Sequence, residues 1–167
     1  NSSLIKYASI SNHLIFESQK LLADHPLNIK RIAEGKDPAN SIWPWSSGYR
    51  PQMEIFSHIF PQVKSGSVIS AVDLIKGIGI YAGLRNIEVE GATGLYNTNY
   101  EGKAQAAVEA LRKDDFVFLH LEASDEAGHE GNIPLKIKTI ESLDSRIIGP
   151  VYEAVKNRAD PVAIAVL

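Results

Sequence analysis

The chain has 167 residues, of which 44% are hydrophobic and 22% are charged, and its formal net charge is -3. This is the composition of a globular protein with one sizeable core. The slightly acidic balance gives no electrostatic basis for binding nucleic acid or an anionic membrane. The absence of cysteine excludes disulfides and thiolate metal sites, so a metal site would require Asp, Glu and His. No apolar run approaches the roughly 18 residues that span a bilayer, and the polar N-terminus is not a signal peptide. We therefore expect a cytoplasmic protein.

The first third of the chain is predicted to be a helix followed by an ordered loop. Apolar residues recur at helical spacing over residues 3–23. Residues 24–52 are rich in Pro, Gly, Ser, Asn and Trp, and a short helix is predicted within residues 53–60. We therefore divide the chain into a helix with an ordered loop, residues 1–52, and a partial metal-binding α/β domain, residues 53–167.

The rest of the chain alternates between predicted strands and predicted helices. Strands are expected at residues 67–72, 86–90, 116–121 and 162–167. Helices are expected around residues 73–82, from a capping box at Thr98 and Glu101 to Leu111, and over residues 134–157. This alternation predicts right-handed βαβ crossovers and a mostly parallel sheet flanked by helices.

Both ends of the chain indicate a piece of a longer protein. The sequence begins at Asn1, without methionine, inside a predicted helix, and it ends on the apolar segment 161–167. In a parallel sheet the functional loops follow the strand ends, so this chain ends where such a loop would begin. We therefore expect an incomplete domain.

A carboxylate and an imidazole follow the third predicted strand at a spacing that suits a metal ion. Asp125 and His129 are four residues apart, among small residues, directly after the apolar run 116–121. Ligands of open α/β sheets bind outside the carboxyl ends of the strands, and divalent metals take oxygen and nitrogen donors. An ordinary loop that contains Asp and Gly by chance explains the same spacing, so the pair alone leaves the question open.

A glycine pattern offers a second hypothesis, that of a noncatalytic dinucleotide-binding module. Gly77 to Ala82 matches G-x-G-x-x-G/A, but a dinucleotide site needs these glycines in the turn between strand and helix. Asp73 to Lys76 stands between the strand and the glycines, which places them inside a helix, where close packing on the sheet explains them equally well. A helical segment Asp73–Gly77 would oppose the dinucleotide hypothesis.

Three further features could contact an anionic ligand or have structural roles. Both tryptophans, Trp43 and Trp45, lie in one Pro-bounded loop with Arg50; burial of the rings against the body of the protein is one interpretation, and a ligand-facing loop with a guanidinium for a phosphate or carboxylate is the other. Lys76 follows the first strand, as either a ligand contact or a solvated helix lysine. His120, inside an apolar strand, is expected to be a hydrogen-bonded core or supporting residue.

These segments together resemble the archaeal-type branch of cofactor-independent phosphoglycerate mutase, in the alkaline phosphatase superfamily. The resemblance covers nearly the whole chain, in the order of the family's motifs. Its motifs are His25-Pro-Leu-Asn28 with Arg31; Asn40-x-Ile-Trp-Pro-Trp45; Ile69-Ser-Ala-Val-Asp-Leu-Ile-Lys-Gly-Ile-Gly79; Gly91-Ala-Thr-Gly94 with Asn97-Thr-Asn99 and Lys103; and Glu122-x-x-Asp-Glu-Ala-Gly-His-Glu-Gly131.

The resemblance implies an alkaline-phosphatase-like α/β fold and a metalloenzyme that interconverts 3-phosphoglycerate and 2-phosphoglycerate through a phosphoserine, in glycolysis and gluconeogenesis. It implies two divalent ions, manganese or magnesium and in some cases zinc, and no requirement for 2,3-bisphosphoglycerate. Asp125 and His129 match two metal ligands of the family, and Lys76 matches a lysine that contacts the transferring phosphoryl group. Arg31, Trp45 and Arg50 are expected to face the substrate.

The family pattern also implies partners that this sequence does not contain. The nucleophilic serine and a metal aspartate would precede the chain, and an Asp-His pair with a further metal histidine would follow Leu167. We therefore expect the chain alone to be inactive and its exposed sheet edges to allow self-association. Another phosphatase or a phosphonate hydrolase of the same superfamily is the alternative enzyme, because a fold does not fix a substrate. No nucleic acid or membrane partner is expected.

Overall fold

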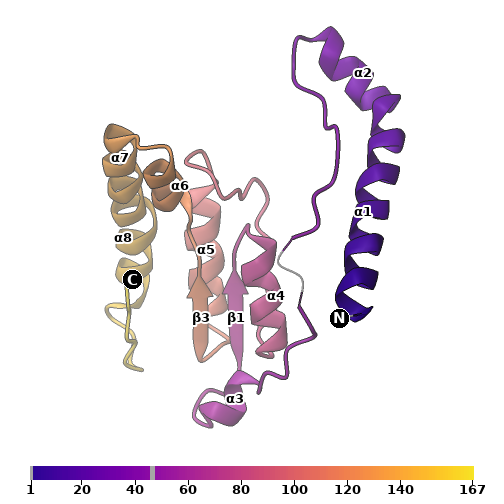
Figure 1. Cartoon of the computed structure of the whole chain (residues 1–167). Helices are drawn as coiled ribbons and strands as arrows, with labels where there is room; N and C mark the ends of the chain where they lie inside the picture. Colours follow the sequence, from indigo (N-terminus) through magenta and orange to yellow (C-terminus); the bar gives the residue numbers. More distant parts are fainter. Residues whose placement is uncertain (1, 46–47) are drawn as a thin grey trace. The chain divides into compact units, whose positions relative to one another are not determined.

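The computed structural model describes residues 2–45 and 48–167, and Figure 1 shows the course of the chain. Asn1, Ser46 and Ser47, which belong to the predicted helix and the Trp-containing loop, lie outside the described residues. The chain divides into two compact units, residues 1–51 and residues 52–167, which are described separately. No helix of the described residues is both long and apolar enough to be a transmembrane segment.

Unit 1 consists of two helices and an extended segment. The predicted first helix is confirmed as α1 (Ser2–Ala23), but a second helix, α2 (Pro26–Ala33), lies where only loop was predicted. Pro26 presets the backbone angle of the first helical residue, and the Nδ1 atom of His25 accepts a hydrogen bond from the backbone N–H of Leu27 at 3.3 Å. The loop prediction failed because proline, which ends a preceding helix, also suits the first turn of the next one.

Two buried polar side chains hold the segment after α2 against α1 and α2. Asn28 is 4% exposed; its Nδ2 donates to the carbonyl oxygens of Leu22 and Ala39, and its Oδ1 accepts from the N–H of Ala39. Ser18 accepts from the N–H of Ile42 at 3.0 Å. The described part of this loop is therefore ordered by hydrogen bonds to side chains rather than by apolar burial.

Unit 2 is built on three parallel strands in the order β2-β1-β3 (Figure 1). The strands are β1 (Gly66–Ile69), β2 (Arg85–Asn86) and β3 (Phe116–Leu119), and the register pairs Ser67 with Arg85 and Ile69 with Leu119. The helices are α3 (Phe56–Ile59), α4 (Asp73–Tyr81), α5 (Tyr100–Ala110), α6 (Ala123–His129), α7 (Ile133–Leu143) and α8 (Gly149–Val155), with a π-helical turn η1 (Asp144–Ile148) between the last two. The predicted α/β class with a parallel sheet flanked by helices is confirmed.

The two crossovers run in opposite directions across the sheet. The chain passes from β1 through α4 to β2 on one side, and from β2 through α5 to β3 on the other. Right-handed crossovers that reverse in this way place their helices on opposite faces of the sheet. β1 is buried along its whole length. The core on the α5 side consists of Tyr100, Ala104, Ala123 and Ile147, with Leu119, Leu121, Leu143 and Val151 packed against it.

Helix α4 lies so close to β1 that one of its positions has no room for a side chain. A Cβ atom on Gly79 would lie 2.5 Å from Cγ1 and 2.9 Å from Cβ of Val68, whereas one on Gly77 would have no atom within 4 Å. Both glycines lie inside the helix, which begins at Asp73 directly after an extended N-cap residue. The glycine pattern therefore reflects close packing of helix on sheet, and the helical segment Asp73–Gly77 opposes the dinucleotide hypothesis.

Three predicted elements differ from the structure. The predicted strand 162–167 is wrong: the segment makes no strand, and Ile164 and Val166 are 42% and 56% exposed. An apolar run is stable as a strand only when a neighbour completes its hydrogen bonds, and the sheet of the described residues offers it none. The predicted second strand, 86–90, is only β2, two residues long. The predicted helix 134–157 is confirmed in position but is interrupted by η1.

The predicted capping box of α5 is also wrong. The N-cap is Asn99, whose Oδ1 accepts from the N–H of Gly102 at 2.9 Å. Thr98 instead accepts from the N–H of Thr93 at 2.9 Å and so ties together the turn that precedes the helix. Glu101 forms an ion pair with Arg146 of η1. Asn99 therefore caps the helix, Thr98 stabilises the preceding turn, and Glu101 links α5 to η1.

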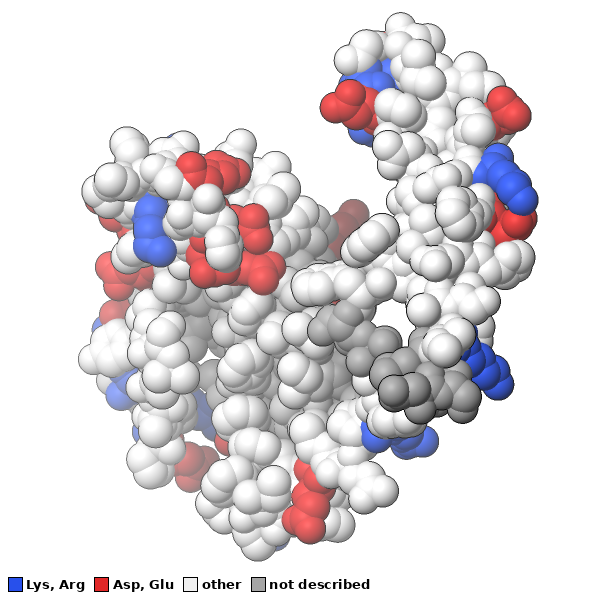
Figure 2. Space-filling view, viewed as in Figure 1, with Lys and Arg blue, Asp and Glu red and all other residues white. Residues whose placement is uncertain are grey.

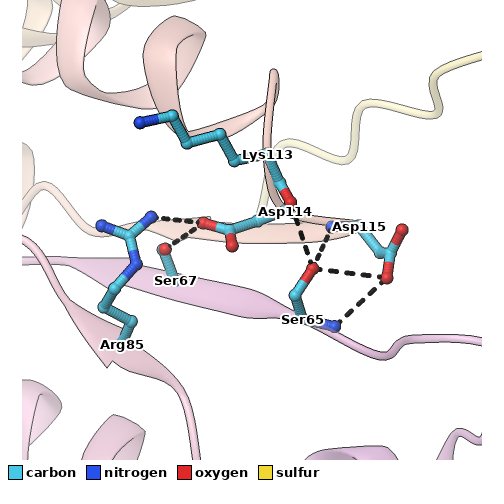
Figure 3. A network of polar contacts seen from close by, with 6 residues as sticks. All are labelled: Ser65, Ser67, Arg85, Lys113, Asp114 and Asp115. Atoms are coloured by element: carbon cyan, nitrogen blue, oxygen red, sulfur yellow. Dashed lines mark hydrogen bonds and ion pairs between the residues drawn. The ribbon is translucent and has the colours of Figure 1, made fainter.

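A polar network closes the amino edge of the sheet (Figure 3). The carboxylate Oδ2 of Asp114, just before β3, accepts from the hydroxyl of Ser67 in β1 and from the guanidinium of Arg85 in β2, the latter at 2.7 Å. Asp115 accepts from the backbone N–H groups of Lys64 and Ser65, and these bonds lower the pKa of its carboxyl. All three strands are thus joined at this edge by side chains that satisfy one another.

Candidate functional site

The loops that follow the three strands meet at the carboxyl edge of the sheet. A Cβ atom on Gly94, in the loop after β2, would lie 2.8 Å from Oε2 of Glu122 after β3 and 3.9 Å from Cγ2 of Val72 after β1. Gly94 is therefore a point of close approach among all three loops. This edge is where ligands of open α/β sheets bind.

The predicted metal ligands lie on a helix rather than in a loop. Asp125 and His129 are one turn apart on α6, and Oδ2 of Asp125 is 3.2 Å from Nε2 of His129. Two ligand atoms of one metal at about 2.0–2.2 Å, with angles between about 90° and 109°, are themselves about 3.0–3.5 Å apart. The observed separation fits this requirement. Both side chains are mostly exposed, at 67% and 74%, so they are accessible to an ion.

The surroundings of this pair are acidic. Figure 2 shows acidic side chains gathered over α6 in unit 2, and α6 itself contributes Glu126 beside Asp125 in its first turn. A field of this sign attracts cations. Among residues 2–45 and 48–167, however, no group of three or more Asp, Glu or His side chains is arranged to hold a metal. The described residues therefore do not by themselves provide the three protein ligands of a zinc site.

Lys76 lies on α4 at the same edge and is already engaged by carboxylates. Its Nζ atom is 3.1 Å from Oε2 of Glu88 and 3.7 Å from Oδ1 of Asp73. Asn86 donates to the other oxygen of Glu88 at 2.7 Å, and these bonds from Lys76 and Asn86 lower the pKa of Glu88. The Lys76 side chain is only 18% exposed. The ammonium group is therefore held in place near the loop ends, rather than free in solvent.

The three predicted substrate contacts lie in unit 1. The Nε atom of Arg31 donates to the carbonyl oxygen of Asp37 at 2.8 Å, which orients the guanidinium on the surface of that unit. Trp43 and Trp45 are 75% and 81% exposed, so neither ring is buried within unit 1. Arg50 is also exposed. Their role toward a substrate remains a prediction.

Two polar residues of unit 2 have positions that the sequence only partly indicated. His120 is hydrogen-bonded to Ser70, 3.2 Å from Nδ1 to Oγ, which confirms the predicted supporting interaction. Lys103 is 1% exposed, and its Nζ donates to the carbonyl oxygen of Thr93 at 3.2 Å. The pKa of Lys103 is lowered because the side chain is buried, and the nearby carboxylate of Glu122 opposes this shift. The available signal was that Lys103 falls on the apolar stripe of α5 with Tyr100, Ala104 and Ala107.

Comparison with known families places this geometry in a wider group. The family model described as metalloenzyme superfamily matches residues 43–165. The chain belongs to the metalloenzyme superfamily. The matched region includes the sheet, α4 and α6. It therefore contains Lys76, Asp125 and His129.

Individual relatives match over most of this chain but over a minor part of their own length. The 2,3-bisphosphoglycerate-independent phosphoglycerate mutase of Methanosarcina mazei is 56% identical over 156 residues, which are 93% of this chain and 39% of that protein. A probable enzyme of the same name from Geobacter sulfurreducens is 54% identical over 86% of this chain and 36% of its own. The structure of the PH0037 protein from Pyrococcus horikoshii is 37% identical with a TM-score of 0.72, over 90% of this chain and 39% of that one. The chain thus spans about two fifths of the relatives that it matches.

Proposed function

We propose that this chain is part of a metal-dependent phosphoglycerate mutase that interconverts 3-phosphoglycerate and 2-phosphoglycerate through a phosphoserine intermediate. The observation that carries the proposal is the Asp125–His129 pair, whose 3.2 Å separation suits one divalent ion. The family match and the names of the relatives support the same reaction. The reaction belongs to glycolysis and gluconeogenesis, and we propose a cytoplasmic location.

Each predicted site residue has a role in this proposal. Asp125 and His129 bind one of two divalent ions. The ions are manganese or magnesium, and in some enzymes zinc. The reaction does not require 2,3-bisphosphoglycerate. Such ions stabilise charge on phosphoryl oxygens and activate a hydroxyl nucleophile. Lys76, held by Glu88, contacts the transferring phosphoryl group. Arg31, Trp45 and Arg50 are the proposed substrate contacts.

The chain by itself is proposed to be catalytically inactive. Two ligands cannot enclose an ion, since metal sites require at least three protein donors, and the described residues hold no such group. The free edges of β2 and β3 are proposed to allow self-association of the isolated chain. Mutase turnover by the isolated chain would contradict this part of the proposal.

A chimaeric enzyme tests the proposed reaction. The matching segment of the Methanosarcina mazei relative is replaced by this chain, and conversion of 3-phosphoglycerate to 2-phosphoglycerate is measured with and without a chelator. We expect activity that depends on added manganese or magnesium. Asp125→Ala should lower kcat/KM at least 100-fold, as is usual for loss of a group that acts in the transition state.

The matched control is Glu126→Gln, a carboxylate on the same turn of α6 without a proposed metal contact. It should retain activity within about threefold. Full activity of Asp125→Ala would overturn the ligand assignment. Hydrolysis of phosphate monoesters without mutase activity would replace the proposed reaction with that of a phosphatase.

A further inference from the structure

The strand order reverses at β1, between the loops after β1 and β3. The chain leaves β1 toward β2 on one side and later returns to β3 on the other. The two loops that follow β1 and β3 therefore diverge from adjacent strands, and in open α/β sheets ligands bind in the crevice formed there. The first residue after β1 is Ser70, and the first after β3 is His120.

These two residues are bonded to each other at the carboxyl edge. Nδ1 of His120 is 3.2 Å from Oγ of Ser70, and the backbone N–H of His120 donates to the carbonyl oxygen of Ile69 at 2.9 Å. Ser70 is 4% exposed, and its Oγ also accepts from the N–H of Val72 at 3.0 Å. The hydroxyl of Ser70 keeps its proton and a second lone pair, and we assign the proton as the donor to Nδ1 of His120.

This assignment leaves Nε2 of His120 as the nitrogen that can bind a ligand. When Nδ1 accepts from Ser70, a neutral imidazole carries its proton on Nε2. Among the described residues, Nε2 of His120 has no hydrogen-bond partner, and the side chain is half-buried. The ring lies parallel to that of Phe118, with 13° between the planes. The imidazole is thus held by the backbone of His120 and by the hydrogen bond at Nδ1. The N–H at Nε2 remains as a donor.

A rival interpretation makes Ser70 a nucleophile with His120 as its base. A nucleophile must be accessible to the atom that it attacks. Ser70 is almost fully buried, and its oxygen is bonded to the N–H of Val72 in the turn into α4. Ser70 therefore orients His120, and the half-buried imidazole is the member of the pair that a ligand can reach.

We propose that His120 binds the substrate of this site through Nε2, donating a hydrogen bond to a phosphoryl oxygen, with Ser70 as its positioning residue. The ligand class is a phosphate monoester or inorganic phosphate. Lys76, on the α4 that follows Ser70, lies at the same carboxyl edge, where its ammonium group is paired with Glu88. The inference rests on the proposed function, because the acceptor of the Nε2 hydrogen bond is a phosphoryl oxygen of the proposed substrate.

Two amide substitutions separate the two nitrogen atoms of His120. His120→Gln places an amide nitrogen near the position of Nε2, whereas His120→Asn preserves a polar atom near Nδ1 and removes the outer donor. In the chimaera, we expect His120→Gln to keep kcat/KM within about fivefold of the unmodified chimaera and His120→Asn to lose at least 20-fold. Ser70→Ala should lower kcat/KM about three- to tenfold, whereas loss of a nucleophile would abolish turnover.

A second readout uses inorganic phosphate and the metal-free chimaera. Phosphate titration followed by ¹⁵N NMR should shift the Nε2 resonance of His120 in the unmodified protein, with a protonated Nε2 and an unprotonated Nδ1. His120→Asn should weaken phosphate binding at least fivefold. His58→Asn, at an exposed histidine of α3, is the matched control and should change neither readout.

The outcomes distinguish this inference from the proposed function. An active chimaera in which His120→Asn equals the unmodified protein, or in which His120→Gln is the weaker variant, would overturn the role of Nε2 and leave the mutase assignment intact. Abolished turnover in a folded Ser70→Ala variant would favour the nucleophile instead. An inactive chimaera would count against the proposed function itself.

Discussion

The two edges of the sheet in unit 2 use polar residues in opposite ways. At the amino edge, Asp114 accepts from both Ser67 and Arg85, and its side chain is only 8% exposed (Figure 3). At the carboxyl edge, the described residues give the His120 ring one hydrogen bond, through Nδ1, and the exposed side chains of Asp125 and His129 lie 3.2 Å from each other.

The difference shows which polar groups stabilise the fold and which are available for a ligand. Buried polar groups lower stability unless they are paired, and the amino edge meets this condition internally. At the carboxyl edge, His120, Asp125 and His129 each make one side-chain polar contact among the described residues, which leaves further donors and acceptors accessible. Substitutions at the amino edge should therefore change stability, and those at the carboxyl edge should change binding.

The largest effect is expected at the packing that supports both edges. Gly79→Ala would place a Cβ atom 2.5 Å from Cγ1 of Val68 and force α4 away from β1. Overpacking of this kind costs about 2–3 kcal/mol of unfolding free energy. Urea unfolding followed by circular dichroism measures the change.

The matched control for this substitution lies two residues earlier in the same helix. A Cβ on Gly77 has no atom within 4 Å, so Gly77→Ala should stabilise the protein by about 0.5–1 kcal/mol through helix propensity. Equal effects of the two substitutions would show that α4 is not packed on β1 as described.

A smaller loss of stability is expected from opening the amino edge. Asp114→Ala removes the acceptor shared by Ser67 and Arg85 and should cost about 1–3 kcal/mol, since the buried hydroxyl of Ser67 is left unpaired. The KM of the chimaera for 3-phosphoglycerate should remain within about twofold. Asp160→Ala, at an exposed residue outside the network, is the control. A large rise in KM for Asp114→Ala would erase the distinction between the two edges.

The fold was predictable from sequence where a segment determines its own structure. The apolar runs of β1 and β3 were identified from their composition, and β1, the central strand, is buried along its whole length. The segment 162–167 has the same composition, yet it forms no strand. Strand pairing depends on a neighbour, which a local pattern cannot show. Similarly, Pro26 suits both the end of one helix and the start of another, and only the structure distinguishes them.

The candidate site was predictable as far as its residues interact along the chain. Asp125 and His129 are four apart, so one helical turn brings them together. The Ser70–His120 bond joins residues 50 apart and depends on the parallel register of β1 and β3. Contacts of that kind require the strand order, which the sequence alone left open.

The smallest effect is expected from an exposed ion pair near the carboxyl edge. Arg146 of η1 donates to both oxygens of Glu101 in α5, at 2.6 and 2.8 Å, and its guanidinium lies 4.4 Å from the centre of the Tyr100 ring. These hydrogen bonds lower the pKa of Glu101 from 4.5 to about 2. A carboxyl whose pKa is lower in the folded state stabilises the fold above its unfolded pKa, and this contribution disappears as pH falls through the folded value.

Glu101→Gln should therefore lower the thermal midpoint by about 1–2 °C at pH 6, as expected of an exposed pair, and the difference from the unsubstituted protein should shrink between pH 4.5 and pH 2. Glu109→Gln is the control, because Glu109 lies on the same helix and its carboxylate accepts only from Gln105. A difference for Glu101→Gln that persists unchanged at pH 2 would mean that the carboxylate charge, and hence the link between α5 and η1, does not contribute as described.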